Sequence, residues 1–187
     1  MPTDDALVEE ILNGSQAAME VLVKRHYREI FAYVYRKTGD YHTSYDLTQD
    51  ILIKMMKGLK SYRRNGRFRH WLLKIAVNQC RDYYRSSEFQ HRNAVEPEEN
   101  LVDEGSNVWD IFRAKQVGNY LKETILTLPA EQREVIVLRF YHDLKMKDIA
   151  QITECKETTA KSRLRQGLAK LRKALKDDET FHTSSSG

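Results

Sequence analysis

The sequence predicts an all-α protein of two small helical domains joined by a flexible acidic linker. Apolar residues recur at three- and four-residue spacing over most of the 187 residues. That spacing stops between Ser86 and Val108, where acids, Pro97 and Gly105 replace bulky apolar side chains. We therefore place a first domain at residues 1–86, the acidic linker at 87–110, a second domain at 111–176 and a polar tail at 177–187.

The first domain begins with a short predicted helix around Leu7 to Leu12, which stops at Asn13-Gly14. Ser15 is a candidate N-cap for the next helix, and Gly39 is placed to end it as a C-cap. The following helix is expected to start at Thr43 or Ser44. Its apolar stripe repeats every four residues, at Leu47, Ile51, Met55 and Leu59. A further helix is expected from about Arg69 to Arg85.

The second domain resumes helical spacing from Val108 to Leu128, and Pro129 is expected at the start of the next helix, which ends at Tyr141 to Asp143. A short helix from Lys147 to Ile152, with Ala150 facing inward, is followed by a turn and a longer helix from about Glu157. Two helices joined by so short a turn predict a helix-turn-helix.

Composition argues against several function classes. No run of about 18 apolar residues and no signal-peptide pattern occurs, so we expect a cytoplasmic protein. The two cysteines, Cys80 and Cys155, lie far apart, and the six histidines show no ligand spacing. We therefore expect no disulfide, no metal, no cofactor and no small-molecule substrate.

The stretch from Lys54 to Arg85 carries ten Lys or Arg and one acid, Asp82, interleaved with aromatic residues. Cations neutralise phosphates and aromatic faces stack on unpaired bases, so this mixture suits single-stranded nucleic acid. A second interpretation is that the cations are a solvated face and that the apolar residues are ordinary core, namely Phe68, Trp71, Leu72 and Ile75.

The second helix of the helix-turn-helix has a basic and hydroxyl-rich outer side that could enter a DNA major groove. The alternative is a helical hairpin with a basic exterior. Glu154 stands in the turn where glycine is usual, and a left-handed conformation there costs about 1 kcal/mol.

Taken together, the motifs resemble the extracytoplasmic-function group of bacterial RNA polymerase sigma factors over nearly the full length. The first domain resembles sigma region two in Arg36–Asp40, Asp46–Ile51, Lys54, Leu59, Tyr62-Arg63, Trp71–Asn78, Asp82 and Arg85. The second resembles sigma region four, with its helix-turn-helix, in Leu128–Arg133 and Lys161–Leu164.

The resemblance implies a non-catalytic initiation factor that binds core RNA polymerase and promoter DNA, both as duplex and as opened non-template strand. The residues expected to dock on the clamp helices of the largest polymerase subunit are Asp46, Gln49, Asp50, Ile53 and Lys54. Those expected to contact DNA near the start site are Tyr62, Arg63, Arg67, Phe68, Trp71, Lys74, Asn78, Arg81 and Arg85. Those expected to contact the upstream element are Thr158, Thr159, Lys161, Ser162, Arg163 and Arg165.

The start and tilt of the recognition helix are left open by three departures from the family pattern, at Glu154, Lys156 and Ala160. A free-standing helix-turn-helix regulator is the main alternative, but it leaves the basic aromatic stretch unexplained. A nuclease using Asp46, Asp50 and a histidine is a third possibility, and no recognisable catalytic motif supports it. Many members of the family are sequestered by an anti-sigma factor, and the sequence leaves open whether this chain has such a partner.

Overall fold

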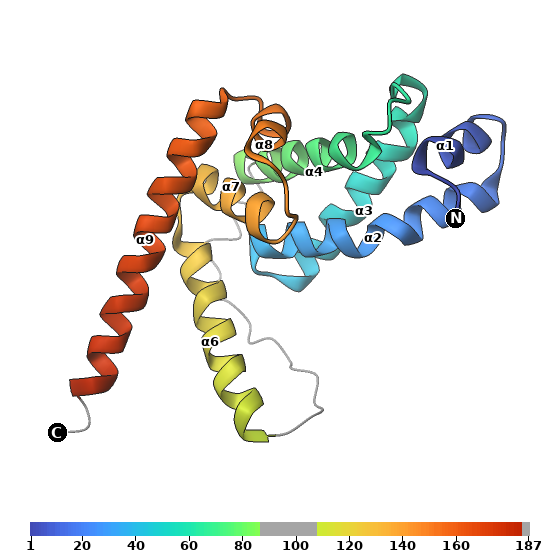
Figure 1. Cartoon of the computed structure of the whole chain (residues 1–187). Helices are drawn as coiled ribbons and strands as arrows, with labels where there is room; N and C mark the ends of the chain where they lie inside the picture. The colour runs from blue at the N-terminus through green and yellow to red at the C-terminus, as the bar shows by residue number, and fades with distance from the viewer. Residues whose placement is uncertain (87–107, 185–187) are drawn as a thin grey trace. The chain divides into compact units, whose positions relative to one another are not determined.

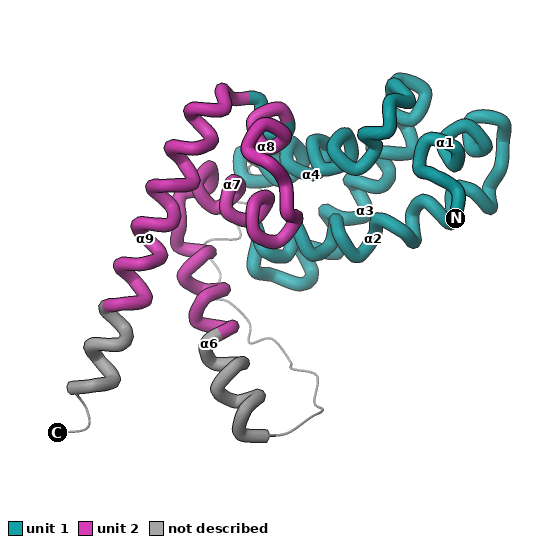
Figure 2. The backbone as a smooth tube through the Cα atoms, in the orientation of Figure 1, with its two compact units in different colours: residues 1–98, 152–154 teal, residues 99–151, 155–187 magenta. Residues whose placement is uncertain are grey.

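The computed structural model describes the backbone of residues 1–86 and 108–184 and the side chains of residues 1–86 and 118–176. Every regular element in these ranges is helical (Figure 1). The chain divides into two compact units, residues 1–98 with 152–154 and residues 99–151 with 155–187 (Figure 2). The predicted all-α class is confirmed, while most of the expected linker lies outside the described residues.

Within residues 1–86 the first unit consists of four α-helices and one short 3-10 helix. Helix α1 packs on α2, α2 packs on both α3 and α4, and α3 packs on α4. The 3-10 helix η1 continues α3 and contacts α1. The bounds are α1 Asp4–Leu12, α2 Gln16–Thr38, α3 Tyr41–Gly58, η1 Leu59–Ser61 and α4 Phe68–Arg85.

The first two helices begin where the sequence offers a hydroxyl N-cap. Thr3 accepts a hydrogen bond from the Ala6 N–H, and Ser15 accepts one from the Ala18 N–H, each at 3.2 Å. Gly14 lies between the helices at φ +97°, a left-handed conformation that glycine adopts without steric cost. The predicted break at Asn13-Gly14 and the Ser15 cap are confirmed.

The third helix starts earlier than predicted. Gly39 ends α2 at φ +75°, as expected, but Asp40 then caps α3, because its Oδ1 accepts from the Thr43 N–H at 2.7 Å. Thr43 and Ser44, the expected starting residues, lie buried inside the first turns. The prediction missed this because it did not consider Asp40, directly after the C-cap glycine, as the cap.

The predicted apolar stripe, which runs along α3 and ends at Leu59 of η1, forms the centre of the first unit. All four of its residues are buried, and they meet apolar residues of α2 and α4 that recur at helical spacing. The stripe consists of Leu47, Ile51, Met55 and Leu59. The opposite face of α3 is left exposed.

Residues 108–184 form four helices, of which α7 packs closely on α9 and α6 also contacts α9. A Cβ added at Gly167 would lie 2.6 Å from Ile136 Cδ1, so a larger residue there would require the Ile136 side chain between α7 and α9 to move. Pro129 is the N-cap of α7 rather than its first residue. The bounds are α6 Val108–Thr127, α7 Ala130–Phe140, α8 Met146–Thr153 and α9 Glu157–Ser184, so α9 includes residues 177–184 that were expected in the tail.

The turn of the helix-turn-helix closes as a left-handed C-cap. Glu154 has φ +55°, and the Cys155 N–H donates to the Ala150 carbonyl at 3.0 Å, the bond of a Schellman motif. A non-glycine residue therefore takes the glycine position, as expected from the sequence. The following helix begins at Glu157, at the predicted residue.

Candidate functional site

The outer face of α3 presents the residues expected to dock on a protein partner. Asp46, Gln49, Asp50, Ile53 and Lys54 are all exposed, and the Ile53 side chain retains 42% of its accessible surface. Two of them are linked to α4: the Gln79 amide donates to Asp50 Oδ2 at 3.4 Å, and Lys54 lies 3.8 Å from Asp82. The structure therefore brings these five residues onto one accessible face.

Three large apolar side chains on the same helix were not included in the sequence prediction. Tyr41, Tyr45 and Met56 are exposed, and their spacing places them beside Ile53 along α3. The Tyr41 ring also lies against Phe31 of α2, with ring centroids 5.4 Å apart. The four-residue spacing of Tyr41, Tyr45 and Ile53 through Gln49 was the sequence signal that could have identified them.

The loop between η1 and α4 exposes a group of cations. Arg63, Arg64 and Arg67 are all exposed, and Gly66 lies among them at φ +72° with open space where a Cβ would be. Arg64 pairs with Glu9 of α1 at 3.2 Å. Two residues predicted to contact DNA, Arg63 and Arg67, thus lie on an accessible, strongly basic loop.

The aromatic residues of this stretch do not form an open stacking platform. Tyr62 and Phe68 retain only 8% and 1% of their accessible surface, and Trp71 is half-buried. Their rings contact one another, with centroids 5.3 Å apart for Tyr62 and Phe68 and 5.1 Å for Tyr62 and Trp71. In this conformation neither Tyr62 nor Phe68 offers a face to a base, and Phe68 is core, as the second interpretation predicted.

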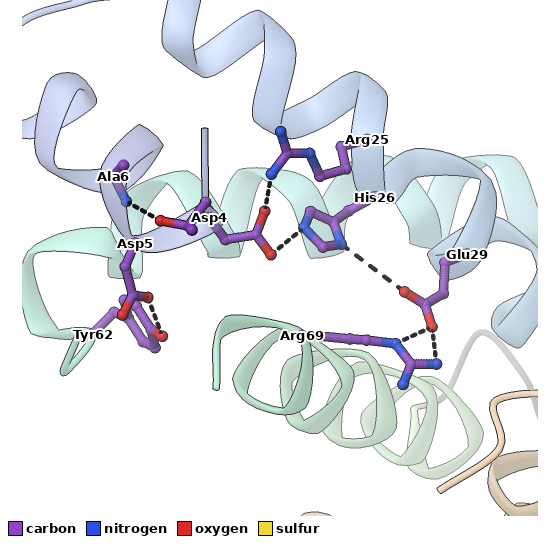
Figure 3. Close-up of polar contacts among 9 residues, drawn as sticks. Asp4, Asp5, Ala6, Arg25, His26, Glu29, Tyr62 and Arg69 are labelled. Carbon is purple, nitrogen blue, oxygen red and sulfur yellow. Dashed lines mark hydrogen bonds and ion pairs between the residues drawn. The ribbon is translucent and has the colours of Figure 1, made fainter. Parts of the chain in front are cut away.

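A polar network beside the loop includes one of the arginines of the basic stretch (Figure 3). Buried His26 lies 3.0 Å from Asp4 Oδ2, while Arg25 binds the other oxygen of Asp4 at 2.6 Å. Arg69 holds Glu29 through two nitrogens, at 2.7 Å and 2.6 Å. The network joins α1, α2 and α4, so Arg69 has a structural role.

Helix α4 carries the other residues predicted to contact DNA near the start site. They follow Trp71 at intervals of three or four residues, which places them on one side of the helix. Arg85, at the end of α4, is exposed. The residues are Lys74, Asn78, Arg81 and Arg85.

The recognition helix α9 divides its predicted contacts into two groups. Thr158, Lys161 and Arg165 are exposed at helical spacing on one side, and Ser162 lies half-buried beside them. The guanidinium of Arg163 turns toward α7 instead, where its Nη2 lies 2.8 Å from Glu131 Oε2 and its side chain is 19% exposed. Lys161 pairs with Glu157 one turn earlier at 2.8 Å.

Thr159, the remaining predicted residue of this helix, is half-buried. The ion pair that Arg163 forms with Glu131 lies within the second unit, and the sequence spacing did not predict it.

Neither a metal-binding chemistry nor a membrane segment emerges from the residues that the structure describes. Within them no group of three or more His, Cys, Asp or Glu side chains is arranged to hold a metal ion. No helix in the same ranges has the length and apolar character needed to cross a membrane.

Comparison with known families matches both halves of the chain. Residues 22–89 match the model of Sigma-70 region 2, and residues 118–171 match that of Sigma-70 region 4. The chain is 31% identical over 172 residues to the ECF RNA polymerase sigma-E factor of Escherichia coli K12, covering 87% of this chain and 88% of that protein. It is 28% identical over 178 residues to the ECF RNA polymerase sigma factor SigW of Bacillus subtilis, covering 91% and 95%.

Solved structures share the fold. The structure of CnrH in complex with the cytosolic domain of CnrY has a TM-score of 0.68 at 24% identity and covers 94% of this chain and 98% of that one. The sigma factor RpoE of Bartonella quintana, solved with the anti-sigma factor NepR, has a TM-score of 0.65 at 24% identity and covers 84% and 96%.

Proposed function

The chain is a member of the extracytoplasmic-function family of RNA polymerase sigma factors, and we propose which of its surfaces carry out the work of such a factor. A sigma factor binds core RNA polymerase and promoter DNA in transcription initiation. We assign polymerase docking to the exposed face of α3, promoter opening to the η1–α4 loop with α4, and upstream duplex recognition to α9. We propose that the first domain, residues 1–86, carries out polymerase docking and promoter opening, and that the second domain, residues 111–176, recognises the upstream duplex.

The observation that carries the docking proposal is the mixed character of the α3 face. Asp46 and Asp50 supply negative charge for a basic partner, and Tyr45, Ile53 and Met56 expose apolar surface that a monomer rarely leaves uncovered. Because the buried stripe of α3 already packs the core, the outer face is left accessible apart from the contacts of Asp50 and Lys54 with α4 and of Tyr41 with α2. The clamp helices of the largest polymerase subunit are the proposed partner.

For promoter opening we propose that the exposed arginines of the loop hold the displaced strand. Arg63 and Arg67 neutralise its phosphates, and the polar side of α4, from Lys74 to Arg85, continues the basic path. Of the three rings that contact one another, Tyr62, Phe68 and Trp71, Trp71 keeps part of its surface for a base. Tyr62 and Phe68 serve the fold of the loop rather than stacking.

For upstream recognition we propose that Thr158, Lys161, Ser162 and Arg165 approach the DNA directly. Lys161 exchanges its contact with Glu157 for a phosphate when DNA binds. Arg163 orients α9 against α7 through Glu131. Thr159, the remaining residue expected to contact the upstream element, is also proposed to contact the DNA.

We propose a non-catalytic role for this chain in the cytoplasm, where core polymerase works. The alternative, a duplex-binding regulator that never joins polymerase, gives no reason for the exposed α3 face. An anti-sigma factor is a proposed regulatory partner, as the Bartonella quintana relative was solved with one.

The first test is binding of the purified chain to core RNA polymerase without DNA, measured by co-elution and by titration. Asp50→Lys should weaken binding about 10- to 100-fold, since a reversed charge meets the basic partner. Glu10→Lys is the matched control, because Glu10 is an exposed acid on α1 away from the docking face, and its binding should equal wild type. Equal affinities for all three proteins would contradict the docking face.

The second test separates a sigma factor from a duplex-only regulator. Permanganate oxidises thymines that are no longer stacked in duplex, so a holoenzyme formed with this chain should give reactive thymines near the start site. Duplex binding by the chain without any reactive thymine would favour the regulator.

A further inference from the structure

The loop between η1 and α4 is organised around one buried hydroxyl, that of Tyr62. This hydroxyl donates to Asp5 Oδ1 at 2.8 Å (Figure 3). The start of the loop is thus tied to α1 through the Tyr62 side chain. The phenol ring itself contacts the rings of Phe68 and Trp71, which also contact each other.

The second oxygen of Asp5 secures the tip of the same loop. Asp5 Oδ2 accepts a hydrogen bond from the Gly66 N–H at 2.7 Å, at the residue with φ +72°. One carboxylate on α1 therefore binds a side chain at the start of the loop and the backbone near its end. The ion pair between Glu9 and Arg64 adds a second link from α1 to the same loop.

We propose that Asp5 and the Tyr62 hydroxyl are positioning residues that fix the loop before DNA arrives, so that Arg63 and Arg67 are presented to the displaced promoter strand in one arrangement. This inference rests on the proposed role of the loop in promoter opening. A loop ordered in advance does not lose conformational entropy when it captures the strand, and hydrogen bonds to a carboxylate are stronger than those between neutral groups.

Protonation of Tyr62 is consistent with this arrangement. Burial, and then the hydrogen bond and charge of Asp5, raise the pKa of Tyr62 to about 12. The phenol is therefore neutral at physiological pH and can donate its proton to the carboxylate.

The proposal differs from base stacking in what it requires of position 62. A stacking residue needs only the ring, so Tyr62→Phe would retain full function. A positioning hydroxyl is lost in Tyr62→Phe although the buried ring remains. Asp5→Asn is the complementary change, because an Asn side chain has one acceptor oxygen for two donors, Tyr62 Oη and Gly66 N.

The first measurement needs no DNA: trypsin cleavage after Arg63, Arg64 and Arg67 in the free full-length chain. Tyr62→Phe and Asp5→Asn should each speed cleavage at these sites about tenfold, while cleavage elsewhere is unchanged. The double variant should cleave no more than about twice as fast as either single variant, since both remove the same link.

The second measurement is the rate at which promoter thymines become permanganate-reactive in holoenzyme. Both single variants should lower this rate about five- to tenfold with unchanged affinity for core polymerase. Two controls should match wild type. Glu10→Gln removes an exposed acid from α1, and Tyr120→Phe removes a similar hydroxyl hydrogen bond, 3.0 Å to the Ala174 carbonyl, from the other unit.

Wild-type cleavage and opening rates in Tyr62→Phe would overturn the proposal. Faster cleavage with an unchanged rate of promoter opening would also overturn it, because ordering of the loop would then have no effect on promoter opening. If Tyr62→Phe misfolded and lost affinity for core polymerase, the nearly isosteric Asp5→Asn variant would test the proposal by the same two measurements, trypsin cleavage and promoter opening. A wild-type holoenzyme that never opened the promoter would instead contradict the proposed function, and the loop proposal with it.

Discussion

Phe68 is the residue at which the two interpretations of the basic stretch predict opposite outcomes. Its ring is 1% exposed and contacts three aromatic rings, with centroid distances of 5.2 Å to His26, 5.3 Å to Tyr62 and 5.5 Å to Trp71. If it is core, Phe68→Ala leaves a cavity among these rings. If it stacked on a base, the same change would leave the fold intact and weaken promoter opening.

The cost can be sized from this environment. Removing a fully buried phenylalanine side chain costs about 3–5 kcal/mol, from lost transfer free energy and an unfilled cavity. A unit of about 85 residues is expected to have a free energy of unfolding of roughly 4–13 kcal/mol. Phe68→Ala should therefore remove between a quarter and all of the stability of the first unit, whereas Phe68→Leu, which keeps most of the apolar volume, should cost about 1–2 kcal/mol.

Urea denaturation followed by tryptophan fluorescence measures this directly. The chain has two tryptophans, Trp71 and Trp109, so a Trp109→Phe background leaves Trp71, a ring partner of Phe68, as the reporter. With a urea dependence of about 1 kcal/mol per molar, Phe68→Ala should lower the midpoint by about 3 M or more. Phe68→Leu should stay folded and open promoters like wild type.

The core assignment of Phe68 would be refuted by an unchanged urea midpoint in Phe68→Ala combined with reduced thymine reactivity. Loss of opening in a stably folded Phe68→Leu, with core affinity retained, would point the same way. Both results would mean that the ring faces the DNA in the working protein.

Gly167→Ala should destabilise the second unit by about 1 kcal/mol in urea titrations, since overpacking against Ile136 outweighs the gain in helix propensity. Adding Ile136→Val removes the clashing Cδ1 and should restore most of the lost stability. Strictly additive effects of the two substitutions would contradict this contact. Glu154→Gly should stabilise the helix-turn-helix by about 0.5–1 kcal/mol in unfolding followed by circular dichroism, because glycine adopts the left-handed conformation at φ +55° without steric strain. A lower stability of the variant would disprove that strain. The raised pKa of Tyr62 means that folding favours its neutral form, so its contribution is complete below pH 10 and lost as the pH rises toward 12. The stability difference between wild type and Tyr62→Phe should shrink between pH 10 and pH 12, and a constant difference would show that the hydroxyl does not ionise in this way.

Local patterns predicted most of the helices because their causes are local. The Ser15 cap, the Gly39 ending and the four-residue stripe on α3 each depend on residues within one or two turns. The same holds for the turn at Glu154. The start of α3 was missed, although its cause, the Asp40 side chain, is also local.

The functional surfaces were predictable in outline and less so residue by residue. Exposure of Asp46 and Asp50 followed from their place off the apolar stripe, whereas the direction of Arg163 toward Glu131 depends on how α7 packs against α9. A helical wheel gives the side of a helix, but it does not give the neighbours that a long side chain will meet.

By itself the sequence determined the all-α class, the two helical units and the sigma-factor family, since periodicity, caps and motifs are written in neighbouring residues. Only the tertiary structure decided that Tyr62 and Phe68 face inward and that Asp5 holds the loop. Asp5 lies 57 residues from Tyr62 and 61 from Gly66 along the chain. Packing of α1 against η1 brings them together, and no short-range pattern records which carboxylate will reach a loop so distant in sequence.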